Sequence, residues 1–231
     1  MARMNRFVLT QAELAIILHY LVGEALAIQN TTNDLAVSTE QLQAAEDELY
    51  DRGILLRDPF SNQLTITGEL ALLLEATLQP STLAILSITE REGTGLPKYF
   101  SFTDELIVLN YVDSQGLQTF LELGTLDHVI NQIIELTTQP FLAHANLPST
   151  AELTALMPEA EKAALLLIIK EPAAATSQPT SLSWLVAHDS LWLADPQAAK
   201  PETTPVQRID QAQLSDLLHT TILAHLVQQP S

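Results

Sequence analysis

The sequence contains no cysteine among its 231 residues. Without thiolates it cannot build a cysteine-ligated zinc finger or an iron–sulfur cluster, and it has no thiol nucleophile. The lack of disulfide-forming residues also favours a reducing compartment. Glycine is scarce as well: there are seven, and the pair Gly93 and Gly95 lacks the third glycine and the following helix of a phosphate-binding loop. These absences remove several common kinds of site.

Basic residues are also few, with 10 Lys and Arg against 28 Asp and Glu and a formal net charge of −18. Such a chain repels phosphate backbones and anionic lipid heads, because both carry the same sign of charge. We therefore expect neither a nucleic acid nor a membrane as a partner. A basic protein surface, or a mainly apolar one, is easier to accommodate.

Long hydrophobic runs are missing too, although 47% of the residues are hydrophobic. The stretch after Arg3 and Arg6 is interrupted by Gln11, Glu13 and His19, so it does not resemble the apolar core of a signal peptide. The most apolar run, Ala163–Ile169, has the length of a strand and not of a membrane span. We expect a cytoplasmic protein with no cofactor.

The first 80 residues show the element order of a winged helix. Thr10 can cap a helix with leucine and isoleucine at helical spacing, and Ser38 or Thr39 can cap a second helix that ends before Gly53. Two short apolar runs within residues 54–67 then predict a hairpin, and a third helix is expected over Gly68–Leu78. We interpret residues 1–80 as a helical, winged-helix-like segment.

The rest of the chain alternates like strands and divides into two similar blocks. Residues 81–140 contain four expected strands, Leu83–Thr89, Lys98–Thr103, Leu106–Val112 and Leu117–Leu123, and then an amphipathic helix beginning near Leu126. Residues 149–231 contain a short helix around Leu153 and Leu156, strands at Ala164–Lys170, Leu182–Ala187, Leu191–Ala194 and Val206–Ile209, links at Glu171–Thr180 and Pro196–Pro205, and a closing helix.

This pattern predicts an α+β fold in one compact unit. Its two halves would each be an antiparallel β-meander closed by an amphipathic helix and would be related by a pseudo-two-fold axis. The spacing of Leu126, Val129 and Ile130 repeats in Leu214, Leu217 and Leu218. Short strands also give rough matches by chance, so both interpretations stay open at this point.

Candidate chemistry is sparse. The helix over Ser38–Gly53 carries five carboxylates and a single arginine, which opposes DNA binding, although a winged-helix transcription regulator is the first alternative function. His188, Asp189 and Ser190 are consecutive, which suits a turn better than a triad, whose side chains must converge. Asp216 and His219 on the closing helix have metal-pair spacing without further ligands.

Paired carboxylates for sugar hydrolysis are offered by Glu90, Glu92, Asp104 and Glu105, all in expected hairpin loops of an acidic protein. Solubility explains these residues more simply than catalysis does. We expect no catalytic residue and no metal ligand, and a hydrolase or small-molecule enzyme is the second alternative.

The features that remain suit a protein-binding module. The loop Glu90–Pro97 is long for a hairpin, and aromatic residues follow it closely. Aromatic and arginine side chains are typical anchors of interfaces. We predict that Arg91, Leu96 and Tyr99 contribute to a partner-binding site, and that an exposed apolar patch lies beside an acidic rim. Core aromatic residues beneath a loop are the competing interpretation, and a homodimer is compatible with either.

At this level of order and length, the chain resembles the EspG family of cytosolic chaperones of type VII secretion systems. The resembling segments are Leu9-Thr10-Gln11-Ala12-Glu13-Leu14, Ala44-Ala45-Glu46-Asp47-Glu48-Leu49, Arg52-Gly53-Ile54-Leu55, and later Ser183-Trp184-Leu185-Val186 with the closing helix. The resemblance covers nearly the whole chain by pattern and not by a diagnostic motif. It implies a two-fold α+β chaperone that grips the helical tip of a secreted heterodimer through its sheet and hairpin loops, including Glu90–Pro97.

Overall fold

The computed structural model describes residues 5–22, 38–60, 64–138, 149–174, 178–194 and 205–226. Most of the predicted link Pro196–Pro205, part of the link Glu171–Thr180 and the end of the wing turn lie outside these residues. The helices are α1 (Gln11–Val22), α3 (Thr39–Asp51), α4 (Gly68–Leu78), α5 (Leu126–Thr137), α6 (Leu153–Leu156) and α7 (Gln211–Leu226), with a 3-10 turn η1 (Met157–Glu159). The strands are β1 (Arg6–Leu9), β2 (Leu55–Arg57), β3 (Leu64–Ile66), β4 (Thr82–Glu90), β5 (Gly93–Thr94), β6 (Lys98–Phe102), β7 (Ile107–Val112), β8 (Gln118–Glu122), β9 (Thr150–Glu152), β10 (Ala160–Lys170), β11 (Thr180–Ala187), β12 (Ser190–Ala194) and β13 (Pro205–Ile209).

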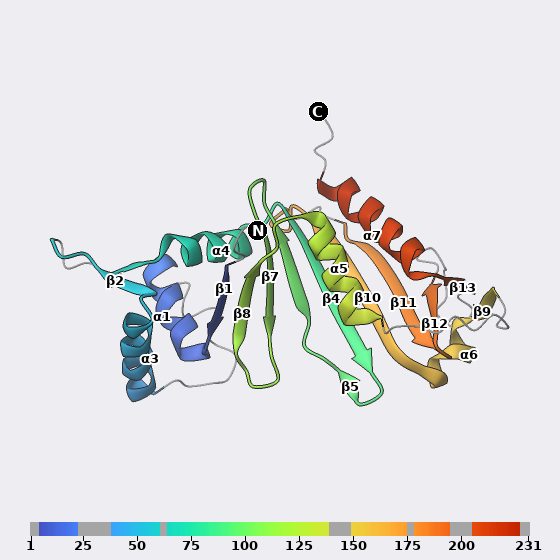
Figure 1. The fold of residues 1–231 in the computed structure, drawn as a ribbon, viewed down its shortest axis with the longest axis horizontal. Helices are drawn as coiled ribbons and strands as arrows, with labels where there is room; N and C mark the ends of the chain where they lie inside the picture. Colours follow the sequence, from blue (N-terminus) through green and yellow to red (C-terminus); the bar gives the residue numbers. More distant parts are fainter. Residues whose placement is uncertain are drawn as a thin grey trace.

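The centre of the molecule is one 11-stranded antiparallel sheet with the order β1-β8-β7-β6-β4-β10-β11-β12-β13-β9, and β5 pairs with β4. Figure 1 shows β4 and β10 side by side in its middle, where they pair from Lys162 opposite Glu90 to Lys170 opposite Thr82. On one side of this pair the chain runs through β6, β7 and β8 into α5, and on the other through β11, β12 and β13 into α7. The predicted α+β class is confirmed.

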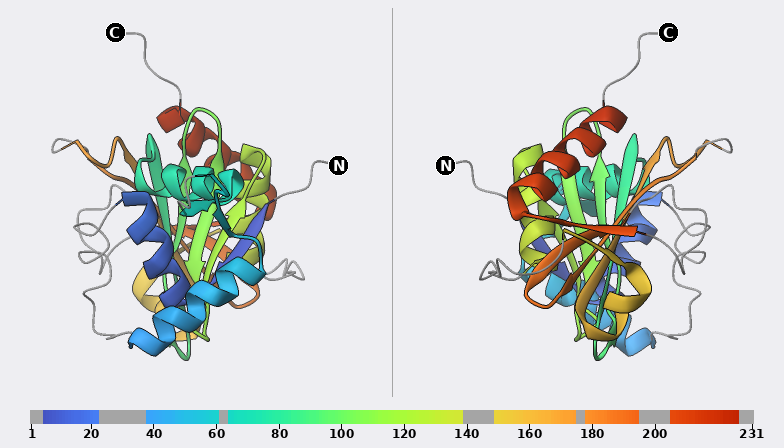
Figure 2. Two further views of the ribbon diagram at one scale, coloured as in Figure 1. Left: turned by 90° about the vertical axis from the view of Figure 1, so that its left-hand side faces the viewer. Right: turned by 90° about the vertical axis from the view of Figure 1, so that its right-hand side faces the viewer.

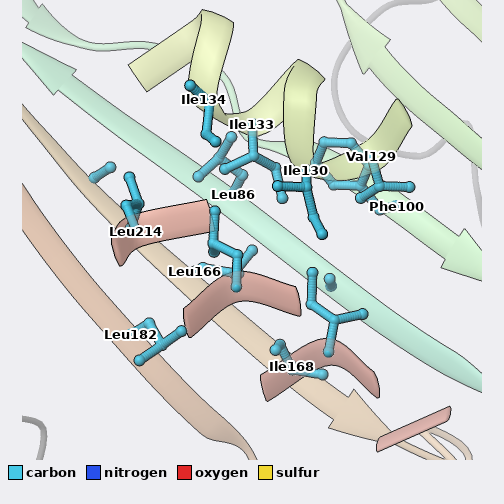
Figure 3. Packing of buried hydrophobic residues seen from close by; sticks show 14 of the residues in the cluster. Leu86, Phe100, Val129, Ile130, Ile133, Ile134, Leu166, Ile168, Leu182 and Leu214 are labelled. Atoms are coloured by element: carbon cyan, nitrogen blue, oxygen red, sulfur yellow. The ribbon is translucent and has the colours of Figure 1, made fainter. Parts of the chain in front are cut away.

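Helices α5 and α7 cover one face of the sheet (Figures 1 and 3). Thr125 caps α5 through its side chain, which accepts a hydrogen bond from the His128 amide. Apolar side chains then recur at helical spacing along both helices and point into the sheet, where central-strand side chains meet them. The main members of this cluster are Leu86, Phe100, Val129, Ile130, Ile133, Ile134, Leu166, Ile168, Trp184, Leu214, Leu218 and Ile222.

The N-terminal segment packs on the opposite face, over β7 and β8 (Figure 2, left). Its helices begin and end close to the predicted residues because their caps are local: Ser38 and Gln41 form a reciprocal capping box, and Gly53 adopts φ +67° where α3 ends. The predicted hairpin is present as β2 and β3, and α4 spans the predicted Gly68–Leu78. Strand β1, which the sequence did not predict, joins the sheet edge beside β8.

A third apolar cluster lies on that same opposite face at the other end of the sheet. There the short helix α6 contributes Leu156, which packs with Leu185 and Trp192 of β11 and β12. The short strand β9 precedes α6 and was not predicted, and β10 begins at Ala160, four residues before the predicted start. Both ends of this face are therefore covered.

Candidate functional site

Between these two covers, the face opposite α5 and α7 carries apolar side chains that remain accessible to water. They alternate along the central strands with the core residues, so β10 buries Leu166 and Ile168 completely while Leu165 is 38% exposed. Leu167 and Ile169 continue the row on β10, opposite Ile85 and Leu83 of β4. Tyr99 of β6 extends the surface sideways, opposite Ile85, and is 36% exposed. We call this surface the open face, and it consists of Leu83, Ile85, Tyr99, Leu165, Leu167 and Ile169.

The sequence of β10 explains the open face. The run Ala163–Ile169 is continuously apolar, which is typical of a strand buried on both sides. Here α5 and α7 cover one side, and the other side lies between the N-terminal segment and α6. An apolar surface of this kind, left open at the centre of a sheet, marks an interaction site more often than a scattered exposed leucine does.

The three predicted binding residues lie around one end of the open face. Tyr99 belongs to it, and the predicted alternation holds because its neighbour Phe100 is fully buried in the core. Arg91 lies at the tip of the β4–β5 hairpin, where its Nε donates a 3.5 Å hydrogen bond to the carbonyl of Ala160. Leu96 follows β5 and is 60% exposed.

The hairpin that carries Arg91 is held by its own contacts. The hydroxyls of Thr89 and Thr94 lie 3.1 Å apart, and the Gly95 amide donates to the Ile88 carbonyl over 3.0 Å. Gly93 adopts φ +140°, a backbone conformation that side chains disfavour. This turn therefore needs its glycine.

A cavity of about 420 Å³ lies between this hairpin and η1. Met157, Pro158 and Ala163 form its apolar wall, and Glu159 contributes a carboxylate. Since Ala163 precedes Leu165 by two residues on β10, the cavity adjoins the open face. Neither Met157 nor Leu165 was predicted from the sequence, although the apolar run in β10 was a usable signal for Leu165. The remaining lining residues are Thr89, Glu90, Arg91 and Ala160.

Charge at this end of the open face is mainly negative. Glu92 and Glu159 are exposed, and Glu161 lies where β10 is bulged between Ala160 and Lys162. Glu90 is paired with Lys162, whose Nζ lies 3.0 Å from it and donates a second bond to the Leu136 carbonyl at the end of α5. Arg91 and Glu159 line the same cavity.

The other sequence candidates do not assemble into a reactive site. His188 and Asp189 have φ +52° and +53° and form the two-residue turn between β11 and β12. The carboxylates of the two hairpins lie at opposite ends of β4, because Thr82 pairs with Phe102 while Glu90 ends the strand. Nine residues of strand separate them by about 27 Å, beyond the reach of a glycosidase pair.

Asp104 and Glu105 instead line a separate cavity of about 460 Å³ near the start of α5. Within the residues that the structure describes, no group of three or more His, Asp or Glu side chains could hold a metal ion. Arg52, the residue that follows α3, is also engaged, since it forms an ion pair with Glu13.

The chain matches no protein-family model and no curated protein. In the described part of the chain, no helix combines the length and the apolar character needed to cross a membrane.

Proposed function

We propose that this protein is a non-enzymatic adaptor or chaperone that binds another protein through the open face. The observation that carries the proposal is the difference between the two faces of β10: Leu166 and Ile168 are fully buried, whereas Leu165 is 38% exposed. When one side of an apolar strand stays exposed to water, the folded protein carries an unfavourable hydration free energy. A partner that covers this side removes that penalty.

The size of the open face suits a short helical segment. Leu165 to Ile169 spans five residues of strand, about 13 Å, which is the length of roughly nine helical residues. The N-terminal segment and α6 flank the open face, so such an element would lie between them. Burial of the exposed third of Leu165 or Tyr99 would contribute roughly 0.5–1 kcal/mol each.

The same proposal includes a pseudo-two-fold relation of the two halves and a winged-helix-like N-terminal module. Four strands and a helix recur on each side of β4 and β10, which supports a pseudo-two-fold relation of the halves. The helix, helix, hairpin, helix order of residues 1–80 supports a winged-helix-like module whose exposed acidic helix α3 suits a protein and not DNA. Both are compatible with the EspG-like chaperone role in the cytoplasm that the sequence resemblance implies.

The test is affinity capture from cells that naturally produce the protein, with tagged wild type and two matched variants. Leu165→Asp places a carboxylate on the open face, and Leu223→Asp places one on α7, where the leucine is similarly exposed, 41% against 38%. We expect a stoichiometric protein to be recovered with wild type and Leu223→Asp and to be lost with Leu165→Asp.

Leu165→Ser serves as a milder second variant, and circular dichroism verifies that each variant is folded. Equal recovery with all folded variants would contradict the proposal, as would recovery lost only with Leu223→Asp.

A further inference from the structure

The cavity of about 420 Å³ between the β4–β5 hairpin and η1 lies on the same side of the sheet as the open face. Ala163, which lines the cavity, packs with the α6 cluster, whereas its neighbour Ala164 belongs to the core beneath α5 and α7. Side chains alternate along a strand, so Ala163 faces the same way as Leu165, two residues or about 7 Å further along β10. A segment that lies on the open face can therefore insert one side chain into the cavity.

The lining of the cavity combines an apolar wall with two charges of opposite sign. The apolar wall consists of Met157, Pro158 and Ala163. The cation is Arg91, whose Nε donates a 3.5 Å hydrogen bond to the carbonyl of Ala160, another lining residue. Of the two lining carboxylates, Glu90 is paired with Lys162, and Glu159 forms no ion pair within the described part of the chain.

This lining favours one class of side chain. A charged side chain of either sign would meet a like charge, and an aliphatic one would remove water from Arg91 and Glu159 without replacing its hydrogen bonds. An aromatic ring that carries a hydrogen-bond donor satisfies both groups. A guanidinium is attracted to the face of such a ring, a methionine sulfur packs favourably against it, and a carboxylate accepts a bond from a phenol O–H or an indole N–H.

We infer that the cavity binds a tyrosine or tryptophan side chain of the protein that covers the open face. This inference rests on the proposed function and adds the residue that anchors the partner. The ring would lie between Met157 and Arg91, and its polar atom would donate to Glu159. Buried aromatic anchors of this kind carry a large share of the binding energy of many protein interfaces.

The experiment is a selection from a displayed, randomised library of helical peptides of about 16 residues against the immobilised full chain. Peptides that also bind Leu165→Asp are discarded. We expect the retained peptides to be enriched in tyrosine or tryptophan at one position. Filling the cavity by Ala163→Leu should lower their affinity roughly tenfold or more, because the ring can no longer be buried.

Tyrosine-containing peptides allow a double-mutant cycle. Replacing that tyrosine by phenylalanine should lower the affinity for wild type roughly threefold and leave the affinity for Glu159→Ala unchanged, because the acceptor is then missing. Ala44→Leu is the matched control, since it adds the same side chain on the exposed side of α3, far from the cavity in Figure 1. It should change the affinity by less than about twofold.

Circular dichroism verifies that each variant is folded, and Met157→Ala replaces Ala163→Leu if the latter is not. Retained peptides without an enriched aromatic residue would overturn this inference alone. So would unchanged affinity for the folded cavity variant, or a phenylalanine effect that persists in Glu159→Ala. If no selected peptide is sensitive to Leu165→Asp, the open face itself is contradicted and the proposed function fails with it.

Discussion

Replacement of Glu13 by glutamine should destabilise the protein by removing one charge from a buried ion pair. Glu13 has a side chain only 3% exposed, and its Oε1 lies 2.6 Å from Nη1 of Arg52 at the end of α3. Its Oε2 accepts a 2.6 Å hydrogen bond from the Thr10 amide, and the Thr10 hydroxyl accepts one from the Glu13 amide. Arg52 also donates to the Val8 carbonyl, so the pair joins β1, α1 and α3.

The geometry of this ion pair sets how far Glu13→Gln should lower the free energy of unfolding. Glutamine keeps the capping box, because its carbonyl can still accept from the Thr10 amide, but its NH2 group then faces Nη1 of Arg52, so Glu13→Gln removes both the charge and the hydrogen bond from Arg52. Loss of one partner from a fully buried pair costs about 3–5 kcal/mol. Since Arg52 is 34% exposed, water partly solvates it after the change. We therefore expect the free energy of unfolding to fall by about 2–3 kcal/mol.

The assay is urea unfolding followed by circular dichroism at 222 nm, with Glu90→Gln as the control. Glu90 forms a 3.0 Å pair with Lys162, but its side chain is 55% exposed, so this change should cost less than about 1 kcal/mol. Tryptophan fluorescence reports on the second half of the sheet, because both Trp184 and Trp192 lie there. If Glu13→Gln shifts the midpoint no further than Glu90→Gln does, the reasoning about the buried pair is wrong.

Two further predictions concern a turn and a lysine. The double change His188→Asn with Asp189→Gly supplies the residues that a two-residue turn with positive φ prefers, so the free energy of unfolding should rise by about 0.5–1 kcal/mol in urea titrations; an unchanged or lowered value would refute this. Burial lowers the pKa of Lys98, which lies 4.8 Å from the Tyr111 ring centre. The unfolded chain therefore binds more protons than the folded chain between the lowered and the ordinary pKa, and stability from this residue rises with pH through that window. Wild type should gain stability relative to Lys98→Met between pH 7 and pH 10, and equal pH profiles would contradict the assignment.

Local signals allowed much of the fold to be predicted. Helix α4 spans the predicted residues, and α3 lies between its predicted caps, because capping and helical spacing are set within a few residues. The strands of both meanders were recognisable from alternation and turn residues. Strand β1 was not, since its pairing of Phe7 with Phe120 depends on a segment more than a hundred residues away.

The candidate site was predictable only in part. Alternation around Phe100 left Tyr99 as a plausible surface residue, and the structure places it on the open face. The apolar run of β10 predicted a strand but not which side would stay uncovered, because that depends on where α5, α7 and the N-terminal segment pack. Met157 had no local signal, since it lines the cavity only through the approach of η1 to the β4–β5 hairpin.

The central claim is that the open face contacts another protein in the cell, and site-specific photocross-linking tests it most directly. A benzoylphenylalanine residue is placed at position 165 on the open face, or at position 223 on α7 as the control. We predict one cross-linked protein of defined mass from position 165 and none from position 223. Absence of an adduct at position 165 in a folded, expressed variant, or the same adduct from both positions, would contradict the account.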